Sequence, residues 1–450
     1  MIGGLKKASL YLFAGASAFA ILASAAPVAK AQYITRAEFE DYKKSQPKVD
    51  WKGAPKISSQ DGKFSFKVRG RLQVDYNSID QDEPITGDPD INDWEARRAR
   101  LGVEGTIWYD WKYKFEIDFA GNDTDVKDAY ISYAGFSDWN HLEILFGQFK
   151  IANSLEGMTS SRFITFMERA FFVEAFQAEP RALGVGLHAG SDEDFGWSFQ
   201  SSYNGPNIGD DGVWDDGPSI WAVRGTIAPV NTDDAIVHLG ASYRSRNNGT
   251  EDGVSALYNY EARPGLHLAD KFVETEPLGE SDQYWGLEGA AVYRRFSVQG
   301  EYAELSTDVP QMYKRMSGGR SINPDYSGWY VFGSVFLTDD MRNYEARKGE
   351  FGRVKPNNPF DIKNGGWGAW EIAGRWDSVD VGADASALLA AGHDCDQCGD
   401  EEGWTLALNW YPTAYTRLMF NVIGTDIGGV FNDNDGADIS GFGMRGQIDW

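Results

Sequence analysis

The residues best suited to chemistry are basic side chains at alternating positions in two segments. FSFKVRGRLQVDY carries Lys67, Arg69 and Arg71, and EARRARLGVEG carries Arg98 and Arg100. A guanidinium group stays charged and offers a planar fork of N–H donors that fits phosphate or carboxylate oxygens. Several such groups in series let an anion move between sites without being trapped. The pattern therefore indicates reversible anion binding. Pairing with neighbouring carboxylates is the alternative, and those carboxylates are Glu104, Glu116 and Asp118.

The segments that position these residues alternate apolar and polar side chains. From Trp111 to Phe119, aromatic and aliphatic residues occupy odd positions and charged residues occupy even ones, which is the period of two of a β-strand. Residues 95–120 indicate two such strands joined by a tight turn at Tyr109-Asp110. Each is about twice the usual strand length of roughly 5 or 6 residues. Such strands suit a wall with lipid on one side and water on the other.

The same alternation recurs to the carboxyl end, where GFGMRGQIDW is a final amphipathic strand that ends in Trp450. Counting candidate strands gives about 16, an even number in the range of membrane barrels. The fold predicted is all-β, a transmembrane antiparallel β-barrel. Connections alternate between short and long. The stretch from Thr338 to Gly366 is long on the short-turn side, and the sequence offers no physical account of it.

One long connection, Lys150 to Arg181, contains the apolar and helix-like run SRFITFMERAFFVEAF. A long segment with apolar content must bury it, and the barrel lumen is the available place. We therefore predict a constriction loop folded into the lumen. Its candidate residues are Glu156, Gly157, Arg162 and Arg169. The loop arginines would either touch solute or pin the loop to the wall.

The amino end indicates export. Two lysines precede an apolar run, and Ala29-Lys30-Ala31 has the pattern of a cleavage site, as in a secretory signal peptide. The predicted organisation is a signal peptide at 1–31, a periplasmic lead-in at 32–62 with a helix from Ala37 to Lys44, and the barrel at 63–450. The formal charge of −25 argues against nucleic-acid binding.

The sequence also resembles the phosphate-selective porins of Gram-negative outer membranes, which are trimeric sixteen-stranded barrels. The resemblance covers Phe64 to Trp450. It is carried by FSFKVRGRLQVDY, RRARLGVEGTIWYDWKYKFEIDF, KDAYISYAGF, FGQFKIANSLEGMTSSRFITFMERA, WGLEGAAVYRRFSVQGEY, GAWEIAGRWDSV and LALNWYP, in that order. It implies an outer-membrane location, a homotrimer, passage of small ions and solutes, and contact with outer-membrane lipid and lipopolysaccharide.

The resemblance further implies an inner arginine ladder made by Arg71, Arg97 and Arg98, with Lys67 as a basic residue on the first of these strands. Phosphate-binding members have a lysine where this sequence has Gly157, and an aspartate near the constriction where it has Lys127. These departures argue against selectivity for phosphate, whereas the lumen is still expected to prefer anions.

Cys395-Asp-Gln-Cys398 and the neighbouring His393 are the only metal-like cluster in the sequence. A single C-x-x-C is weak evidence for a metal, and a local disulfide is expected in an exported chain. We predict no enzymatic activity, since no G-x-S-x-G occurs and none of the five histidines stands in a nucleophile motif. We also predict no cofactor. Two alternatives to a porin remain: an outer-membrane barrel enzyme, and a structural or adhesive barrel with a plugged lumen. Acidic loop runs, such as DNDGAD, are either solvated surface or divalent-cation bridges to lipopolysaccharide phosphates.

Overall fold

The structure is a computed structural model that describes residues 35–450, except 82–89, 123, 137, 178–179, 210–216, 252–253, 256 and 311–321. The chain divides into two compact units, 1–48 and 49–450. In the first unit, helix α1 (Arg36–Ser45) begins with a capping box between Thr35 and Glu38, close to the helix predicted at Ala37 to Lys44. The expected signal peptide, 1–31, lies outside the described residues.

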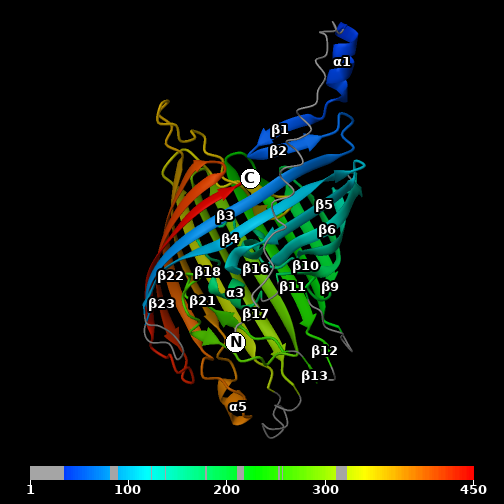
Figure 1. Cartoon of the computed structure of the whole chain (residues 1–450). Coiled ribbons are helices and arrows are strands. Elements are labelled where there is room, and N and C mark those ends of the chain that lie inside the picture. The colour runs from blue at the N-terminus through cyan, green and yellow to red at the C-terminus, as the bar shows by residue number, and fades with distance from the viewer. Residues whose placement is uncertain are drawn as a thin grey trace, which may run out of the picture. The chain divides into compact units, whose positions relative to one another are not determined.

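The second unit is a closed antiparallel barrel (Figure 1). Within the described residues, sixteen strands pair each with the next along the chain, and β24 pairs with β3 to close the ring. The barrel strands are β3 (Ser65–Gln81), β4 (Asp90–Ile107), β5 (Trp111–Asp118), β6 (Asp125–Phe136), β7 (Leu142–Lys150), β8 (Arg181–Ser191), β9 (Gly196–Asn204), β10 (Ser219–Asn231), β11 (Ala235–Asn247), β16 (Ser281–Tyr293), β17 (Phe296–Asp308), β18 (Asp325–Phe336), β21 (Ala369–Asp380), β22 (Asp400–Thr413), β23 (Thr416–Gly428) and β24 (Asp438–Asp449). The predicted fold class is confirmed.

Shorter elements lie in the connections. They are β1 (Lys48–Lys52), β2 (Ala54–Ser58), η1 (Ala120–Asn122), α2 (Leu155–Met158), α3 (Phe171–Ala175), β12 (Thr250–Glu251), β13 (Val254–Ser255), β14 (Glu261–Ala262), β15 (Val273–Glu274), β19 (Tyr344–Glu345), β20 (Glu350–Phe351) and α5 (Ala385–Ala390). We call the barrel end with the connections β4–β5, β10–β11 and β22–β23 the turn end, and the opposite end the loop end.

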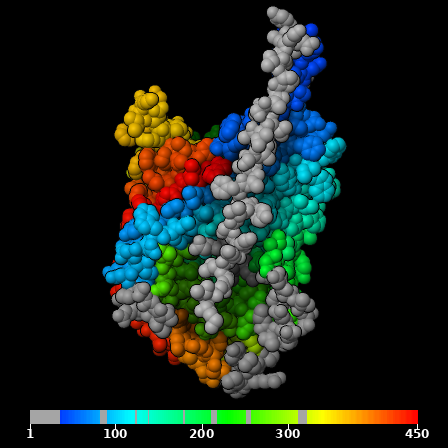
Figure 2. Space-filling view, viewed as in Figure 1, coloured from blue at the N-terminus to red at the C-terminus, as the bar shows by residue number. Residues whose placement is uncertain are grey.

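The two faces of the barrel wall follow the predicted alternation. In β5, Trp111 and Phe115 are 43% and 41% exposed on the outside, whereas Glu116 is 4% exposed. In β3 and β4, Leu72, Leu101 and Ile107 are likewise exposed on the outer face, which Figure 2 shows in blue and cyan. An apolar outside and a polar inside are the arrangement of a barrel in lipid. No helix among the described residues is long and apolar enough to span a membrane.

The main apolar core lies in the lumen of the barrel, where the inserted loop packs against the inner face of the wall. Phe166, Phe171 and Phe172 from the loop between β7 and β8 are almost fully buried, and they pack against wall residues that include Tyr330 and Phe332. Figure 1 shows α3 within the ring of strands. The prediction that this loop folds into the lumen agrees with the structure. The helix-like run in it forms helix only at Phe171–Ala175. In the preceding residues, the main-chain carbonyls of Ile164, Thr165 and Glu168 accept hydrogen bonds from arginines of the wall, which compete with helical hydrogen bonds.

Two further connections enter the barrel. Residues 257–280, between β11 and β16, add Tyr260, Leu266 and Phe272 to the same core. At the turn end, the stretch from Thr338 to Gly366 carries the hairpin of β19 and β20. Phe351 in that hairpin packs in a buried cluster with Leu155 of the constriction loop. The unusual length of this turn therefore serves to fill the lumen from its turn end.

Candidate functional site

A cavity of about 870 Å³ lies inside the barrel, between the wall of strands β3–β8 and the constriction loop. Most of the predicted site residues line it: Arg69, Arg71, Arg97, Arg98, Arg100, Lys127, Gly157, Arg162 and Arg169. Lys67 and Glu156 do not. The Glu156 side chain instead accepts a hydrogen bond from the Ala170 amide, with Oε2 and N 2.8 Å apart, so it stabilises the loop's own fold.

The cavity is electropositive although the chain is acidic. Its lining contains fourteen arginines and lysines against ten carboxylates, a net formal charge of plus four, whereas the whole chain carries −25. A low-dielectric wall focuses such a field into the water that it encloses. The cavity therefore attracts anions even though the rest of the surface repels them.

A β-bulge places two consecutive arginines on the inner face. The register between β3 and β4 pairs Arg98 with Gln73 and Ala96 with Val74, so Arg97 has no partner opposite it. Without the bulge, the period of two would turn Arg97 towards the outside. With it, Arg97 reaches Glu168 in the constriction loop, with two N–O distances of 2.9 Å, while Arg98 donates to Gln73 Oε1 at 3.1 Å.

The arginines of the wall pair with Glu104, Glu116 and Asp118, the carboxylates named above as their alternative partners. Arg100 lies 2.7 Å from Asp118 and 3.3 Å from Glu116. Arg69 bonds Glu104 and lies 3.6 Å from Glu116, which is also 3.9 Å from Arg71. Three guanidinium groups thus share Glu116. The pairing fixes their geometry without neutralising all of their charge.

Glu168 joins the constriction loop to β4 and β24, the two strands that flank β3 in the wall. It binds Arg97 on β4, binds Arg445 on β24 at 2.6 Å, and lies 3.8 Å from Arg98. Burial alone would raise the pKa of this carboxyl, but Arg97, Arg445 and Arg98 outweigh burial and hold the pKa well below its usual range. Glu168 is therefore an anion at neutral pH, surrounded by guanidinium groups.

The two loop arginines differ in what they contact. Arg169 donates to the main-chain oxygens of Glu156 and Thr159, both at 3.0 Å, which pins the loop to itself. Arg162 lies 3.6 Å from Asp449 at the end of β24. Burial, together with the nearby charge of Arg69, lowers the pKa of Arg162 to about 10, so it remains a cation at neutral pH.

The two positions that depart from the resemblance are both on the cavity lining. Lys127 is paired with Asp125. Gly157 leaves no side chain there, and a Cβ at this position would lie 2.2 Å from Gln177 Nε2. Lys150, at the end of β7, donates to the carbonyl oxygen of neighbouring Met158 at 3.2 Å. A lysine thus reaches this part of the loop from the wall.

Sequence reasoning missed several charged residues of the lining. On the wall, Asp128 binds both Lys114 at 2.5 Å and Arg181 at 2.9 Å. The alternation in β5 signals Lys114, which shares the inner face with Glu116. Arg347, Lys348 and Glu350 also line the cavity, and no local signal marks them, since they come from the turn-end hairpin.

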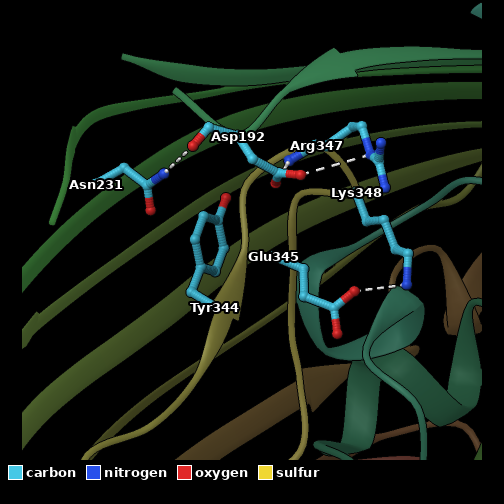
Figure 3. A pocket seen from close by; sticks show the side chains of 6 residues that line it. All are labelled: Asp192, Asn231, Tyr344, Glu345, Arg347 and Lys348. Atoms are coloured by element: carbon cyan, nitrogen blue, oxygen red, sulfur yellow. Dashed lines mark hydrogen bonds and ion pairs between the residues drawn. The ribbon is translucent and has the colours of Figure 1, made fainter. Parts of the chain in front are cut away.

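Arg347 and Lys348 also line a second cavity of about 260 Å³. Figure 3 shows this cavity, with Arg347 facing Asp192 and Lys348 facing Glu345; the ion-pair distances are 3.5 Å and 2.5 Å. Because the two residues belong to both linings, they stand at the junction between the main cavity and the second one.

Nothing in the described residues forms a cluster of three or more histidine, cysteine or carboxylate ligands for a metal. The weak candidate at His393 loses its sulfur ligands because Cys395 and Cys398 form a disulfide, as the sequence analysis expected. His238, on the inner face of β11, bonds Tyr344 and Glu288 Oε1 at 2.5 Å and 3.0 Å, so its ring is occupied by structural contacts.

A closed sixteen-stranded barrel with an apolar outside, a water-accessible cavity and a loop folded into its lumen defines a porin of the outer membrane. Comparison with known proteins identifies the family. Residues 66–450 match the family described as phosphate-selective porin O and P, and the chain belongs to this family. The resemblance found in the sequence is thereby confirmed.

Two similar proteins and one solved structure illustrate the relationship. Porin O of Pseudomonas aeruginosa is 28% identical over 434 residues, covering 89% of this chain and 91% of its own. An uncharacterized protein of Caulobacter vibrioides is 29% identical over 394 residues, covering 83% of this chain and 70% of its own. The anion-selective porin from Comamonas acidovorans superposes with a TM-score of 0.51 at 12% identity, covering 86% of this chain and all of that one, which shows a shared fold.

Proposed function

We propose that this porin provides passive diffusion of small anions across the outer membrane. The observation that carries the proposal is the lining of the main cavity, with its excess of four cationic groups. Phosphate and carboxylate solutes fit it, because the lining presents guanidinium forks from Arg71, Arg98 and Arg100. The family name and the anion-selective porin of similar fold support the same solute class.

We propose a general anion preference instead of one restricted to phosphate. Gly157 contributes no ammonium group, and Lys127 is held by Asp125. Lys150 supplies an amino group beside the loop, but it is tied to the carbonyl of Met158. The guanidinium groups share carboxylates, so each binds a passing oxyanion weakly. Weak sites in series favour throughput over selectivity.

The proposal extends to the setting of the barrel. Residues 1–31 act as a signal peptide that is removed on export, and residues 32–62 form a lead-in that lies in the periplasm. The barrel assembles as a homotrimer in outer-membrane lipid. The acidic runs of the loop end, including DNDGAD, contact lipopolysaccharide through divalent cations.

Solute flux into proteoliposomes tests this function. We compare uptake of an anionic and a cationic organic solute of matched size by the wild-type porin and by the double variant Arg71→Gln/Arg98→Gln. Removing these cations leaves Glu116 with Arg69 and Arg100, and leaves Glu168 with Arg97 and Arg445. The barrel should therefore keep its fold, which heat-modifiable gel mobility checks.

An anion 4 Å from one positive charge gains about 1 kcal/mol in water, or about a fivefold higher local concentration. We expect the double variant to lower the ratio of anion to cation flux about fivefold or more. Arg294→Gln is the matched control, because Arg294 is 63% exposed at the turn end and is absent from the cavity lining. Equal ratios in all three proteins contradict the proposal.

The alternative of a plugged barrel with a structural role is not favoured, because the three inserted segments leave a cavity of about 870 Å³ in the lumen. If the lumen were plugged, neither solute would enter liposomes that carry the wild-type protein faster than it enters empty ones. The same assay therefore separates the two functions.

A further inference from the structure

The segment 257–280 crosses the lumen at the loop end. It leaves β11 and returns to β16, yet its middle contacts the far wall. A Cβ on Gly443 of β24 would lie 2.6 Å from the Leu266 side chain, and Gln81 of β3 donates to Asp270 at 2.8 Å. Leu266 and Phe272 are at most 1% exposed. The crossing is therefore fixed in place.

At the far wall, this segment meets β4 through one ion pair. His267 Nδ1 lies 2.7 Å from Glu95 Oε2, and the two side chains are 32% and 15% exposed. The other oxygen of Glu95, Oε1, is buried and makes no hydrogen bond within the described part of the chain. Glu95 precedes the ladder residue Arg97 by two positions, on the loop-end side. The pair thus lies where solute from the loop end would approach the arginines.

The other charged groups around this pair already have partners, all of them charged except the amide of Gln81. Asp75, opposite Glu95 on β3, is bound by Arg445 at 2.6 Å. The remaining pairs in the neighbourhood are Arg97 with Glu168, Arg263 with Glu174, Lys271 with Glu261, and Gln81 with Asp270. Arginine, lysine and carboxylate side chains ordinarily titrate far from neutral pH, so histidine is the residue type that can supply a proton-dependent charge here.

We propose that the pair of His267 and Glu95, on the loop-end side of Arg97, is a proton-dependent charge that strengthens the preference for anions in acid and weakens it in mild alkali. The inference rests on the proposed anion channel. Histidine ordinarily titrates at about pH 6.5. When His267 is protonated, it offsets Glu95; when it is neutral, Glu95 adds an uncompensated negative charge in front of Arg97.

The size of the effect follows from one unit of charge. At about 8 Å in water, a unit charge changes the energy of an ion by about 0.5 kcal/mol, and by more where the wall lowers the effective dielectric constant. Low ionic strength limits screening. We expect the ratio of anion to cation permeability to rise about two- to fourfold between about pH 8 and about pH 5.5.

The test is the reversal potential of the full porin in planar bilayers, in a dilute potassium chloride gradient at these two pH values. His267→Gln should remove the pH dependence and keep the ratio at its alkaline value, whereas His267→Lys should keep it at the acidic value. His393→Gln is the matched control, because His393 lies in the connection between β21 and β22 and is absent from the cavity lining. It should retain the wild-type pH dependence.

The outcomes separate this inference from the function that it builds on. A wild-type ratio that favours chloride but does not change with pH overturns the inference alone, as does a pH dependence that persists in His267→Gln. A wild-type channel that favours potassium at both pH values, or does not conduct, overturns the proposed function itself.

Discussion

Replacing Glu168 with glutamine removes the charge that ties the constriction loop to the wall while keeping the shape of the side chain. The carboxylate binds Arg97 through two contacts of 2.9 Å and Arg445 through one of 2.6 Å. It is 7% exposed. Loss of one partner from a buried ionic cluster costs about 3–5 kcal/mol, because the remaining charges stay desolvated without compensation. We therefore expect Glu168→Gln to lower the free energy of unfolding by about 3 kcal/mol.

Glu174→Gln provides the matched comparison within the same loop. Glu174 pairs with Arg263 at 2.7 Å, but the two side chains are 30% and 25% exposed, so water screens the pair. Exposed ion pairs contribute about 0–1 kcal/mol. Chemical unfolding of both variants in detergent micelles, followed by tryptophan fluorescence, measures the difference. If Glu168→Gln is no more destabilised than Glu174→Gln, the loop is not anchored by its charge and our account of the constriction is wrong.

Three further predictions concern acid, the disulfide and the turn-end hairpin. The pKa of Glu168 in the folded protein is held below its ordinary value of 4.5. The ion pairs of Glu168 therefore stabilise the fold fully above that pH, and this stabilisation is lost as the pH falls through the lower pKa of the folded state. Unfolding measured from about pH 5 downwards should show the loss, and Glu168→Gln should make the loss smaller. Joining Cys395 to Cys398 closes a very short loop, so replacing both with serine should destabilise that loop by about 2 kcal/mol and speed its proteolysis without altering ion selectivity. Gly349→Ala should lower the thermal unfolding temperature more than Gly62→Ala does. Both glycines have positive φ, but a Cβ at Gly349 would lie 2.6 Å from Thr226 Oγ1, whereas a Cβ at Gly62 would meet nothing.

The sequence predicted the wall because the information needed is local. Alternation of side chains assigns each residue of β5 to a face without reference to any other strand. The same reasoning placed Arg69, Arg71 and Arg100 in the lumen. It fails for Arg97, which faces inward only because one extra residue in β4 shifts the register against β3. A bulge leaves no mark in the period of a single strand, so the resemblance to a family, and not the alternation, pointed to Arg97.

The contents of the lumen were harder to predict because they depend on contacts between distant segments. Apolar residues in the constriction loop signalled burial, but the wall that receives them supplies hydrogen bonds that compete with helix. Arg417 of β23, for example, donates to the carbonyl of Ile164 at 2.6 Å. The insertion between β18 and β21 has few apolar residues at a regular period. Its role becomes clear only where Phe351 meets Leu155 in a buried cluster.

The cationic cavity beside the constriction loop should conduct anions. The reversal potential of the wild-type porin in a planar bilayer, with a potassium chloride gradient at neutral pH, tests it most directly. We predict a potential with the sign of the chloride equilibrium potential. A potential with the sign for potassium, or a bilayer that carries no current, would contradict the account.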